Sequence, residues 1–236
     1  MVDSLGPYAL GPGGECEGIY IGDARELAKA IPDESVDLIF TDPPYMREYL
    51  PLYGWLGDAA ARILKPDGFL LAYAGIFHKQ AIMEFLGRSL DYFWDFVAYG
   101  RNGPGSMVWA RKVVSKAKSI LTYTKPGQTP RPRCSVLGVW VGSGQDKRFH
   151  VWGQDESTAR YYIDCFSHVG DVLVDPFCGG GTAPAMCKVL RRKCLAFEIE
   201  PDVGLSARER VRATSMLLPG LGFDQMELAC NGGGEP

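Results

Sequence analysis

The sequence lacks the long apolar segment that a membrane-spanning helix needs. Its longest apolar run covers residues 68–77, whereas a span takes ~20 residues. Residues 1–15 hold no basic patch followed by an apolar stretch, so we expect no secretory signal. The seven cysteines form neither a CxxC pair nor a Cys/His metal-binding spacing, which favours free thiols in a reducing compartment. These absences exclude a membrane protein and a disulfide scaffold, and they favour a cytoplasmic globular protein without a metal site.

Acidic residues are nearly missing from the middle of the chain. Residues 101–148 hold ten basic residues and one acid, Asp146, which gives a net charge of +9. The whole chain of 236 residues carries −3, so the remainder sums to −12. A basic segment rich in glycine and proline within an acidic frame is typical of a nucleic-acid contact surface. A solvated loop region that happens to be basic explains the charge equally well.

Apolar runs and helical spacings alternate through most of the chain. Apolar runs predict strands over residues 18–23, 36–40, 68–77, 92–100, 119–125, 170–177 and 193–200. Helical spacing predicts helices over residues 24–32, 56–64, 79–90, 157–169, 182–192 and 203–217. The Pro66-Asp67-Gly68 triplet predicts a turn, and the aromatic run at 92–101 predicts core packing. The alternation predicts an α/β fold with a mainly parallel sheet.

The segment VLVDPFCGGGT at 172–182 places a carboxylate and three glycines between a strand and a helix. Glycines let a ligand approach the backbone, and the start of the helix offers free N–H groups. The spacing matches neither the GxGxxG dinucleotide fingerprint nor a P-loop. The next strand ends at Glu198 and Glu200, where an acid can accept hydrogen bonds from ribose hydroxyls. The alternative is a tight strand–helix turn that binds nothing.

The segment TDPPY at 41–45 follows the strand predicted over 36–40, at the sheet edge where α/β proteins bind ligands. Its two prolines fix the backbone and leave carbonyls free to accept hydrogen bonds. Asp42 is a second acceptor, and Tyr45 supplies an aromatic face. Acceptors beside a stacking ring suit a planar group with an exocyclic amine, such as N6 of adenine. The alternative is a rigid turn with a capping aspartate.

Together, DPPY at 42–45 and DPFCGGGT at 175–182 resemble the catalytic and cofactor motifs of amino-group DNA methyltransferases. The catalytic motif comes first and the basic segment lies between the two, an order that resembles the permuted β class of that family. The resemblance implies a Rossmann-like methyltransferase fold with a circularly permuted motif order and a small inserted target-recognition region. It also implies methyl transfer from S-adenosyl-L-methionine to N6 of adenine, by direct displacement on a flipped base.

The resemblance assigns roles to individual residues. The catalytic candidates are Asp42, Pro43, Pro44 and Tyr45. The cofactor-binding candidates are Asp23, Ala24, Asp175, Phe177, Cys178, Gly179, Gly181, Thr182 and Glu198. The basic segment supplies the candidate nucleic-acid contacts Arg101, Arg131, Arg133, Lys147 and Arg148.

The expected organisation has five parts. They are an N-terminal extension (1–17), a catalytic half (18–125), a short basic recognition region (126–150), a cofactor-binding half (151–217) and a flexible tail (218–236). DNA is the expected partner, in the cytoplasm at the nucleoid. A homodimer is compatible with the family, and a restriction partner stays open. The alternative functions are N4-cytosine methylation, RNA or protein-glutamine methylation, and a non-catalytic nucleic-acid-binding role.

Overall fold

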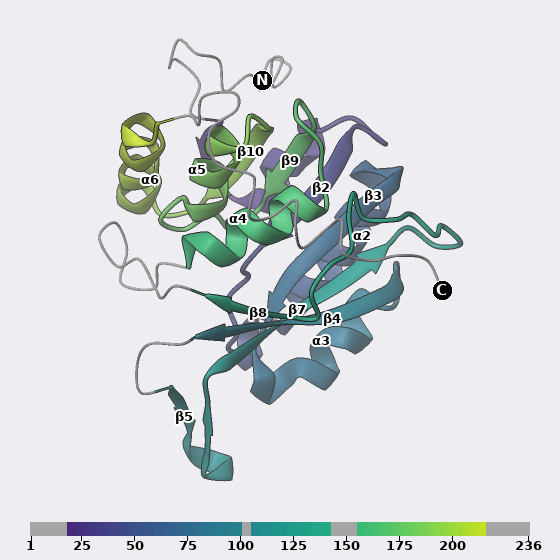
Figure 1. The fold of residues 1–236 in the computed structure, drawn as a ribbon, viewed down its shortest axis with the longest axis vertical. Helices are drawn as coiled ribbons and strands as arrows, with labels where there is room; N and C mark the ends of the chain where they lie inside the picture. Colours follow the sequence, from purple (N-terminus) through teal and green to yellow (C-terminus); the bar gives the residue numbers. More distant parts are fainter. Residues whose placement is uncertain (1–17, 101–104, 143–154, 216–236) are drawn as a thin grey trace.

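The computed structural model of the chain describes residues 18–100, 105–142 and 155–215. A twisted sheet of eight strands runs through the middle of the molecule, with helices on both of its faces (Figure 1). None of the helices within the described ranges is long and apolar enough to cross a membrane. The predicted α/β class is therefore confirmed.

The strands of the sheet are ordered β1-β10-β9-β2-β3-β7-β4-β8. Neighbouring strands run parallel except where β7 pairs with β3 and with β4. The predicted mainly parallel sheet is thus confirmed. The strands span Ile19–Ile21 (β1), Val36–Thr41 (β2), Leu64–Ala74 (β3), Asp91–Gly100 (β4), Ala117–Thr124 (β7), Val139–Gly142 (β8), Val172–Asp175 (β9) and Lys193–Glu198 (β10).

Two helical layers cover the sheet because side chains of a buried strand alternate between its faces. In β2, Leu38 and Phe40 pack in one apolar cluster with α4, α5 and α6, whereas Ile39 packs in the other cluster with α1, α2 and α3. The helices span Ala24–Leu27 (α1), Leu50–Ile63 (α2), Lys79–Leu86 (α3), Glu156–Cys165 (α4), Thr182–Val189 (α5) and Pro201–Ala213 (α6).

Two predictions around β3 are wrong. The expected turn at Pro66-Asp67-Gly68 lies inside the strand, at a bulge where Val36 pairs with Leu64 but Leu38 already pairs with Phe69. Proline and glycine within a strand pattern mark such a bulge as readily as a turn. The strand then ends at Ala74, and residues 76–78 form a short 3₁₀ helix that leaves Ile76 and Phe77 exposed.

The aromatic run at 92–101 is not the core strand that we expected. Residues 91–100 do form β4, but Tyr92, Trp94 and Tyr99 are exposed and only Phe96 is fully buried. Aromatic residues favour strands whether or not the face that they line is covered, so composition alone did not reveal the exposure. Sequence reasoning also missed β8 and a small hairpin of β5 (Ser106–Val108) and β6 (Val113–Ser115).

Thiol burial follows the prediction within the described ranges. Four cysteines are buried and Cys134 is half-buried, and none of these five described cysteines forms a disulfide. The buried four are Cys165, Cys178, Cys187 and Cys194.

One edge of the sheet gathers the sequence motifs. The parallel strands β1, β10, β9, β2 and β3 all end there, and antiparallel β7 begins there. Ser119 of β7 pairs with Ala74 of β3, and Ala117 pairs with Tyr99 of β4. The starts and ends of these strands therefore place side chains from distant parts of the sequence beside one another.

Candidate active site at the carboxyl edge of the sheet

The two sequence motifs meet through a buried hydrogen bond. β2 and β9 are neighbours, so Thr41 and Asp175 end adjacent strands. The Thr41 hydroxyl donates to Oδ1 of Asp175 at 2.7 Å, and the backbone N–H of Phe177 donates to the same oxygen at 3.2 Å. The glycine loop after β9 is thereby anchored to the strand that carries the DPPY segment.

Asp175 is almost inaccessible, with 4% of its surface exposed. Burial raises its pKa to about 7, and the negative charges of Asp42 and Glu198 add to the rise. The hydrogen bonds from Thr41 and Phe177 oppose it by favouring the charged form. Asp42, Asp175 and Glu198 therefore lie near one another at this edge of the sheet. The buried Asp175 is bonded to Thr41 of the one motif and Phe177 of the other.

The glycine loop uses its glycines for different purposes. Gly181 adopts φ +76°, and a Cβ there would lie 3.0 Å from the Cβ of Ala207, so glycine allows α6 to pack closely. Gly179 adopts φ +48°, and no described atom lies within 4 Å of a Cβ built on it. The Gly179 side of the loop is therefore the one that a ligand can approach.

Cys178 has no features of a nucleophile. Its thiol is buried, and burial raises its pKa well above the usual range. A thiolate is the reactive form of cysteine, so this environment suppresses reactivity.

Glu198 binds the loop as well as the strand end. Its Oε2 accepts the Gly179 N–H at 2.9 Å, and its Oε1 accepts the Glu200 N–H at 3.0 Å. The Glu198 carbonyl accepts the Gly22 N–H at 2.8 Å, which ties the end of β1 to the same point. Each carboxylate oxygen has further acceptor capacity, so these bonds orient the group without saturating it.

Asp23 and Ala24 lie next to Glu198 at the start of α1. Asp23 caps the helix by accepting the Arg25 N–H at 2.8 Å, and the Arg25 guanidinium pairs with the same carboxylate at 2.6 Å. The hydrogen bond from Arg25 lowers the pKa of Asp23. Ala24 is buried against the sheet. Both residues therefore follow directly on the end of β1 that the Gly22–Glu198 bond ties to this edge of the sheet.

Sequence reasoning missed Arg210, a fully buried arginine in α6. Its guanidinium donates to the Gly180 carbonyl and to Oγ1 of Thr182, both at 3.0 Å, and pairs with Glu156 at 2.7 Å. Arg210 thus supports the loop from beneath. No local pattern marked it, because the stretch RERVR looks like the solvated face of a helix.

The DPPY segment brings its acceptor and its ring together. The Tyr45 hydroxyl donates a hydrogen bond to Oδ1 of Asp42. Pro43 is buried, and Pro44 and Tyr45 are half-buried. A Cβ on Gly75 would lie 2.9 Å from the Cβ of Tyr45, so only glycine lets the loop after β3 pack this closely on the ring.

Lys118 is the second residue that sequence reasoning did not place in the site. Its Nζ lies 3.6 Å from Oδ2 of Asp42, 3.4 Å from the Tyr45 hydroxyl and 5.4 Å from the centroid of the Tyr45 ring. Lys118 is the second residue of β7 and precedes Ser119, which pairs with Ala74 at the end of β3. This position in β7 places Lys118 opposite the DPPY segment.

Burial and neighbouring charge act against each other on Asp42. Burial raises the pKa of Asp42, whereas the Lys118 ammonium lowers it in part. The side chains that interact with it come from five parts of the fold: Lys118 from β7, Tyr45 from the motif, Tyr53 from α2, Tyr73 from β3 and Asp175 from β9.

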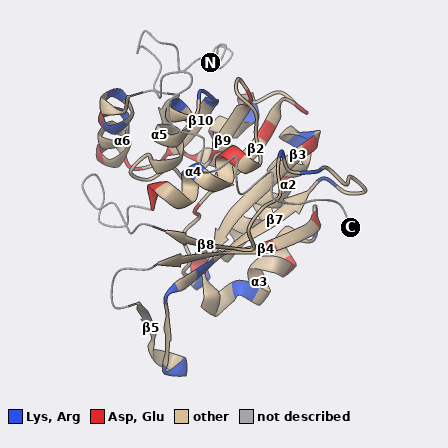
Figure 2. Ribbon diagram, in the orientation of Figure 1, with Lys and Arg blue, Asp and Glu red and all other residues tan. Residues whose placement is uncertain are grey.

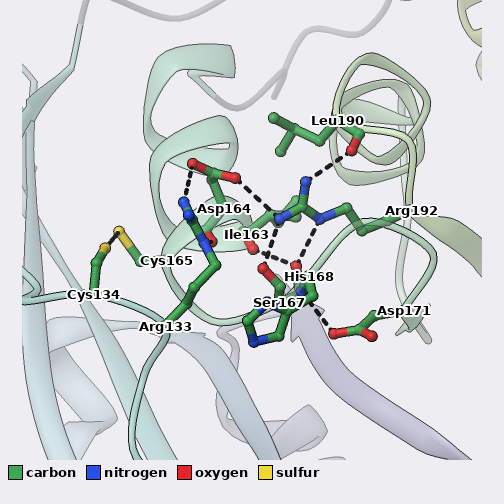
Figure 3. A network of polar contacts seen from close by, with 10 residues as sticks. All are labelled: Arg133, Cys134, Ile163, Asp164, Cys165, Ser167, His168, Asp171, Leu190 and Arg192. Carbon is green, nitrogen blue, oxygen red and sulfur yellow. Dashed lines mark hydrogen bonds and ion pairs between the residues drawn. The ribbon is translucent and has the colours of Figure 1, made fainter. Parts of the chain in front are cut away.

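The candidate nucleic-acid residues fare differently. Arg131 is exposed, whereas Arg101, Lys147 and Arg148 lie outside the described residues. Arg133 pairs with Oδ2 of Asp164 at 2.6 Å and also donates to the Asp164 carbonyl at 2.9 Å (Figure 3).

The partner of Arg133 belongs to a structural network. Oδ1 of Asp164 pairs at 3.0 Å with Arg192, which is only 3% exposed (Figure 3). The Arg133 N–H also donates to the Cys165 carbonyl at 2.8 Å. Arg133 therefore fastens the segment before β8 to α4, and its contact with DNA stays a prediction.

Comparison with known proteins gives consistent matches. The DNA methylase family model matches residues 136–207. The type II methyltransferase M.HpaI of Haemophilus parainfluenzae is 26% identical, covering 82% of this chain and 73% of that protein. M.BamHI of Bacillus amyloliquefaciens is 27% identical, covering 77% of this chain, and the chain spans about half of its length (54%).

Solved structures match over most of the chain. The M1.HpyAVI–SAM complex aligns with a TM-score of 0.69 at 23% identity, covering 82% of this chain and 98% of that one. The cytosine-N4-specific PvuII DNA methyltransferase aligns with a TM-score of 0.70 at 18% identity, covering 89% of each chain.

The chain is similar to amino-group DNA methyltransferases in part of its sequence and in its fold. The structural matches bear out the predicted Rossmann-like methyltransferase fold. The match to the DNA methylase family covers the glycine loop, Glu198 and the start of α6. The DPPY segment and Lys118 precede that stretch, so their roles rest on the geometry described above.

We predict that Asp175→Asn stabilises the fold at pH 8 and that this advantage shrinks as the pH falls toward 4. The folded chain holds the Asp175 proton up to about pH 7, whereas the carboxyl of the unfolded chain ionises near 3.8. The wild type therefore loses stability as the pH rises through this window. The amide oxygen of asparagine still accepts from Thr41.

Thermal denaturation at pH 5 and pH 8 measures the effect. Asp67→Asn, which changes an exposed acid of the same charge, is the matched control. The prediction is contradicted if the stability of the wild type relative to Asp175→Asn increases as the pH rises.

Proposed function

We propose that the chain transfers a methyl group from S-adenosyl-L-methionine to the exocyclic N6 amine of adenine in DNA. The observation that carries this proposal is the arrangement at the sheet edge. Asp42, Tyr45 and Lys118 form one cluster, and the Thr41–Asp175 bond joins it to the glycine loop and Glu198. An amine-binding half and a nucleoside-binding half thus adjoin each other.

The residues around the glycine loop fit the proposed cofactor. Gly179 leaves open space beside the backbone, and Glu198 presents an oriented carboxylate next to it. A carboxylate in this position suits two ribose hydroxyls. The bound cofactor supplies a methyl group activated by a positively charged sulfur. Asp175 braces the loop from beneath in this proposal, since it is buried and engaged by Thr41.

The DPPY segment would prepare the target amine. The lone pair of an exocyclic amine is delocalised into the base, so the amine is a poor nucleophile. The N–H groups of the amine would donate hydrogen bonds to Asp42 and to the Pro43 carbonyl. These bonds would return electron density to the nitrogen that is methylated. Tyr45 would stack on the base, which must leave the duplex to reach the site. The rate gain would come from positioning and electrostatics, without a covalent bond to the enzyme.

Methylation of cytosine N4 is the second candidate. The PvuII enzyme, which shares this fold, is specific for that amine. The chemistry at the nitrogen is the same for both bases. Asp42, rather than serine, before the two prolines favours adenine in our proposal.

DNA is the proposed partner, in a cytoplasmic setting at the nucleoid. We propose the catalytic half at 18–125, the basic recognition region at 126–150 and the cofactor-binding half at 151–217. Within the recognition region, β8 extends the central sheet beside β4. Ten basic residues against one acid in 101–148 support a polyanionic substrate.

We expect Asp42→Ala to abolish methyl transfer and to leave the affinity for S-adenosylmethionine near the wild-type value. The reason is the separation of the amine-binding cluster from the glycine loop and Glu198. Asp42→Asn should keep partial activity if hydrogen-bond acceptance matters more than charge.

The assay transfers labelled methyl to duplex DNA and then identifies the nucleoside. N6-methyladenine supports the main proposal and N4-methylcytosine supports the second. Full activity of Asp42→Ala would remove the DPPY segment from the mechanism.

Glu198→Ala should weaken S-adenosylmethionine binding roughly tenfold or more, because a hydrogen bond to a charged group contributes about 1.5–3 kcal/mol. Loss of the bond to the Gly179 N–H acts in the same direction. Titration calorimetry measures the affinity, and Glu200→Ala is the matched control. If Glu200→Ala shows the loss and Glu198→Ala does not, the ribose assignment moves to Glu200.

Lys118→Met should move the acidic limb of the pH–rate profile to higher pH. An ionised Asp42 is the stronger hydrogen-bond acceptor for the amine, and Lys118 lowers the pKa of Asp42 against the effect of burial. Without that charge, Asp42 is protonated at a higher pH and activity is lost earlier on acidification.

Lys118→Arg should restore the wild-type profile. Lys125→Met removes an equal charge from beyond the far end of β7, where Lys125 pairs with Glu34, and should leave the profile unchanged. An unshifted limb in Lys118→Met would show that Lys118 does not control Asp42.

A further inference from the structure

A small two-stranded ribbon projects from the same edge as the candidate active site. β5 (Ser106–Val108) and β6 (Val113–Ser115) are antiparallel and form a sheet of their own. The ribbon lies between the end of β4 and the start of β7, which meet at the edge that carries the DPPY segment. Figure 1 shows it extending beyond the end of the main sheet.

The tip of the ribbon exposes an aromatic side chain that contributes little to the fold. Trp109 is 81% exposed, more than any other large apolar side chain recorded in the described ranges. Met107, Val113 and Val114 are also exposed along the ribbon. Lys112 takes a left-handed conformation, φ +52°, which turns the chain sharply at the tip. An exposed apolar surface of this kind is typical of an interaction site.

The charge around Trp109 has one sign. Arg111, Lys112 and Lys116 are exposed, and the sequence holds no acidic residue between Arg101 and Gln145. Figure 2 shows basic residues at the tip of the ribbon. An exposed aromatic ring among cations complements a partner that offers both negative charge and flat apolar faces. Nucleic acid presents this combination, because its backbone is negatively charged and its bases have flat faces on which a ring can stack once a base step is opened.

A contact links the ribbon to the loop behind Tyr45. The Arg111 guanidinium lies over the Phe77 ring, 5.1 Å from its centroid. Phe77 follows Gly75, which packs on Tyr45. The tip therefore contacts the same short segment that packs on Tyr45.

We propose that the β5–β6 ribbon enters a groove of duplex DNA and that Trp109 inserts between neighbouring base pairs, where its ring stacks on the base face that the insertion exposes. A two-stranded ribbon fits the width of the major groove. The choice of duplex DNA as the partner rests on the proposed function. The ribbon supplies a contact that the catalytic residues do not, because Trp109 reaches the duplex from outside the amine-binding cluster.

Binding to duplex DNA tests the proposal. The probe is a labelled duplex of mixed genomic sequence, and affinity is measured over a series of salt concentrations without S-adenosylmethionine. Trp109→Ala should bind roughly tenfold or more weakly with an unchanged slope against salt, because stacking carries no charge. Trp109→Phe keeps a ring and should lose less.

Two comparisons separate stacking from charge. Lys112→Gln combined with Lys116→Gln should lower the salt slope by about two, since each lysine that contacts a phosphate adds about one. Trp94→Ala removes another exposed tryptophan, 54% exposed, from the opposite end of β4 and should leave the affinity unchanged.

Several outcomes would overturn the proposal. Wild-type affinity in Trp109→Ala would do so, and so would an equal loss in Trp94→Ala. If sedimentation shows that Trp109→Ala converts a dimer to a monomer while DNA affinity per protomer is unchanged, the ribbon instead joins two copies of the chain.

The outcome is separable from that of the proposed function. The binding assay needs no methyl transfer, so an inactive chain that binds duplex DNA through Trp109 still supports the ribbon contact. Conversely, a wild-type chain that methylates DNA while Trp109→Ala binds normally retains the proposed function and loses only the ribbon.

Discussion

The buried hydrogen bond between Thr41 and Asp175 fixes the relation of the two halves of the candidate site. Each residue ends a strand, and the strands are neighbours although their sequences lie far apart. The bond holds a carboxylate where water is nearly absent, and burial raises the pKa of that carboxylate to about 7. A group so placed costs free energy unless it is paired, so its partners must stay in position. The glycine loop and the DPPY segment are positioned together for this reason.

The negative charges of the carboxylates at the carboxyl edge of the sheet repel one another, which is the second constraint on the candidate site. Asp42 and Glu198 both raise the pKa of Asp175, so a further group must offset the repulsion. Lys118 approaches Asp42 from β7, which enters the sheet antiparallel and so begins at this edge. Arg210 supports the loop from α6 and binds the Gly180 carbonyl. Because β7 is antiparallel to its neighbours, its first residues lie at this edge and place Lys118 beside the acids at the ends of the parallel strands.

The sequence predicted the parts of the site that local chemistry determines. Asp42 follows an apolar strand, and Asp175 and Glu198 each end one. Because parallel strands end at one edge of a sheet, the meeting of these three residues could be anticipated. Lys118 and Arg210 could not, because each acts through a partner far away in the sequence, and the pairing of β7 or the packing of α6 decides that partner. The exposed aromatics of β4 were misjudged for a related reason, since strand propensity does not reveal which faces are covered.

The basic residues of segment 101–148 have different roles in the fold, which the composition of the segment could not reveal. Its ten cations looked like one surface in the sequence. In the fold, Lys118 faces Asp42, Lys125 pairs with Glu34 and Arg133 fastens Asp164. These three serve the site or the fold. The cations that remain exposed at the ribbon surround Trp109, next to the loop that packs on Tyr45. The same composition therefore contributes Lys118 to the candidate site and leaves a basic, aromatic projection at the same edge of the sheet, as the proposed contact with DNA requires.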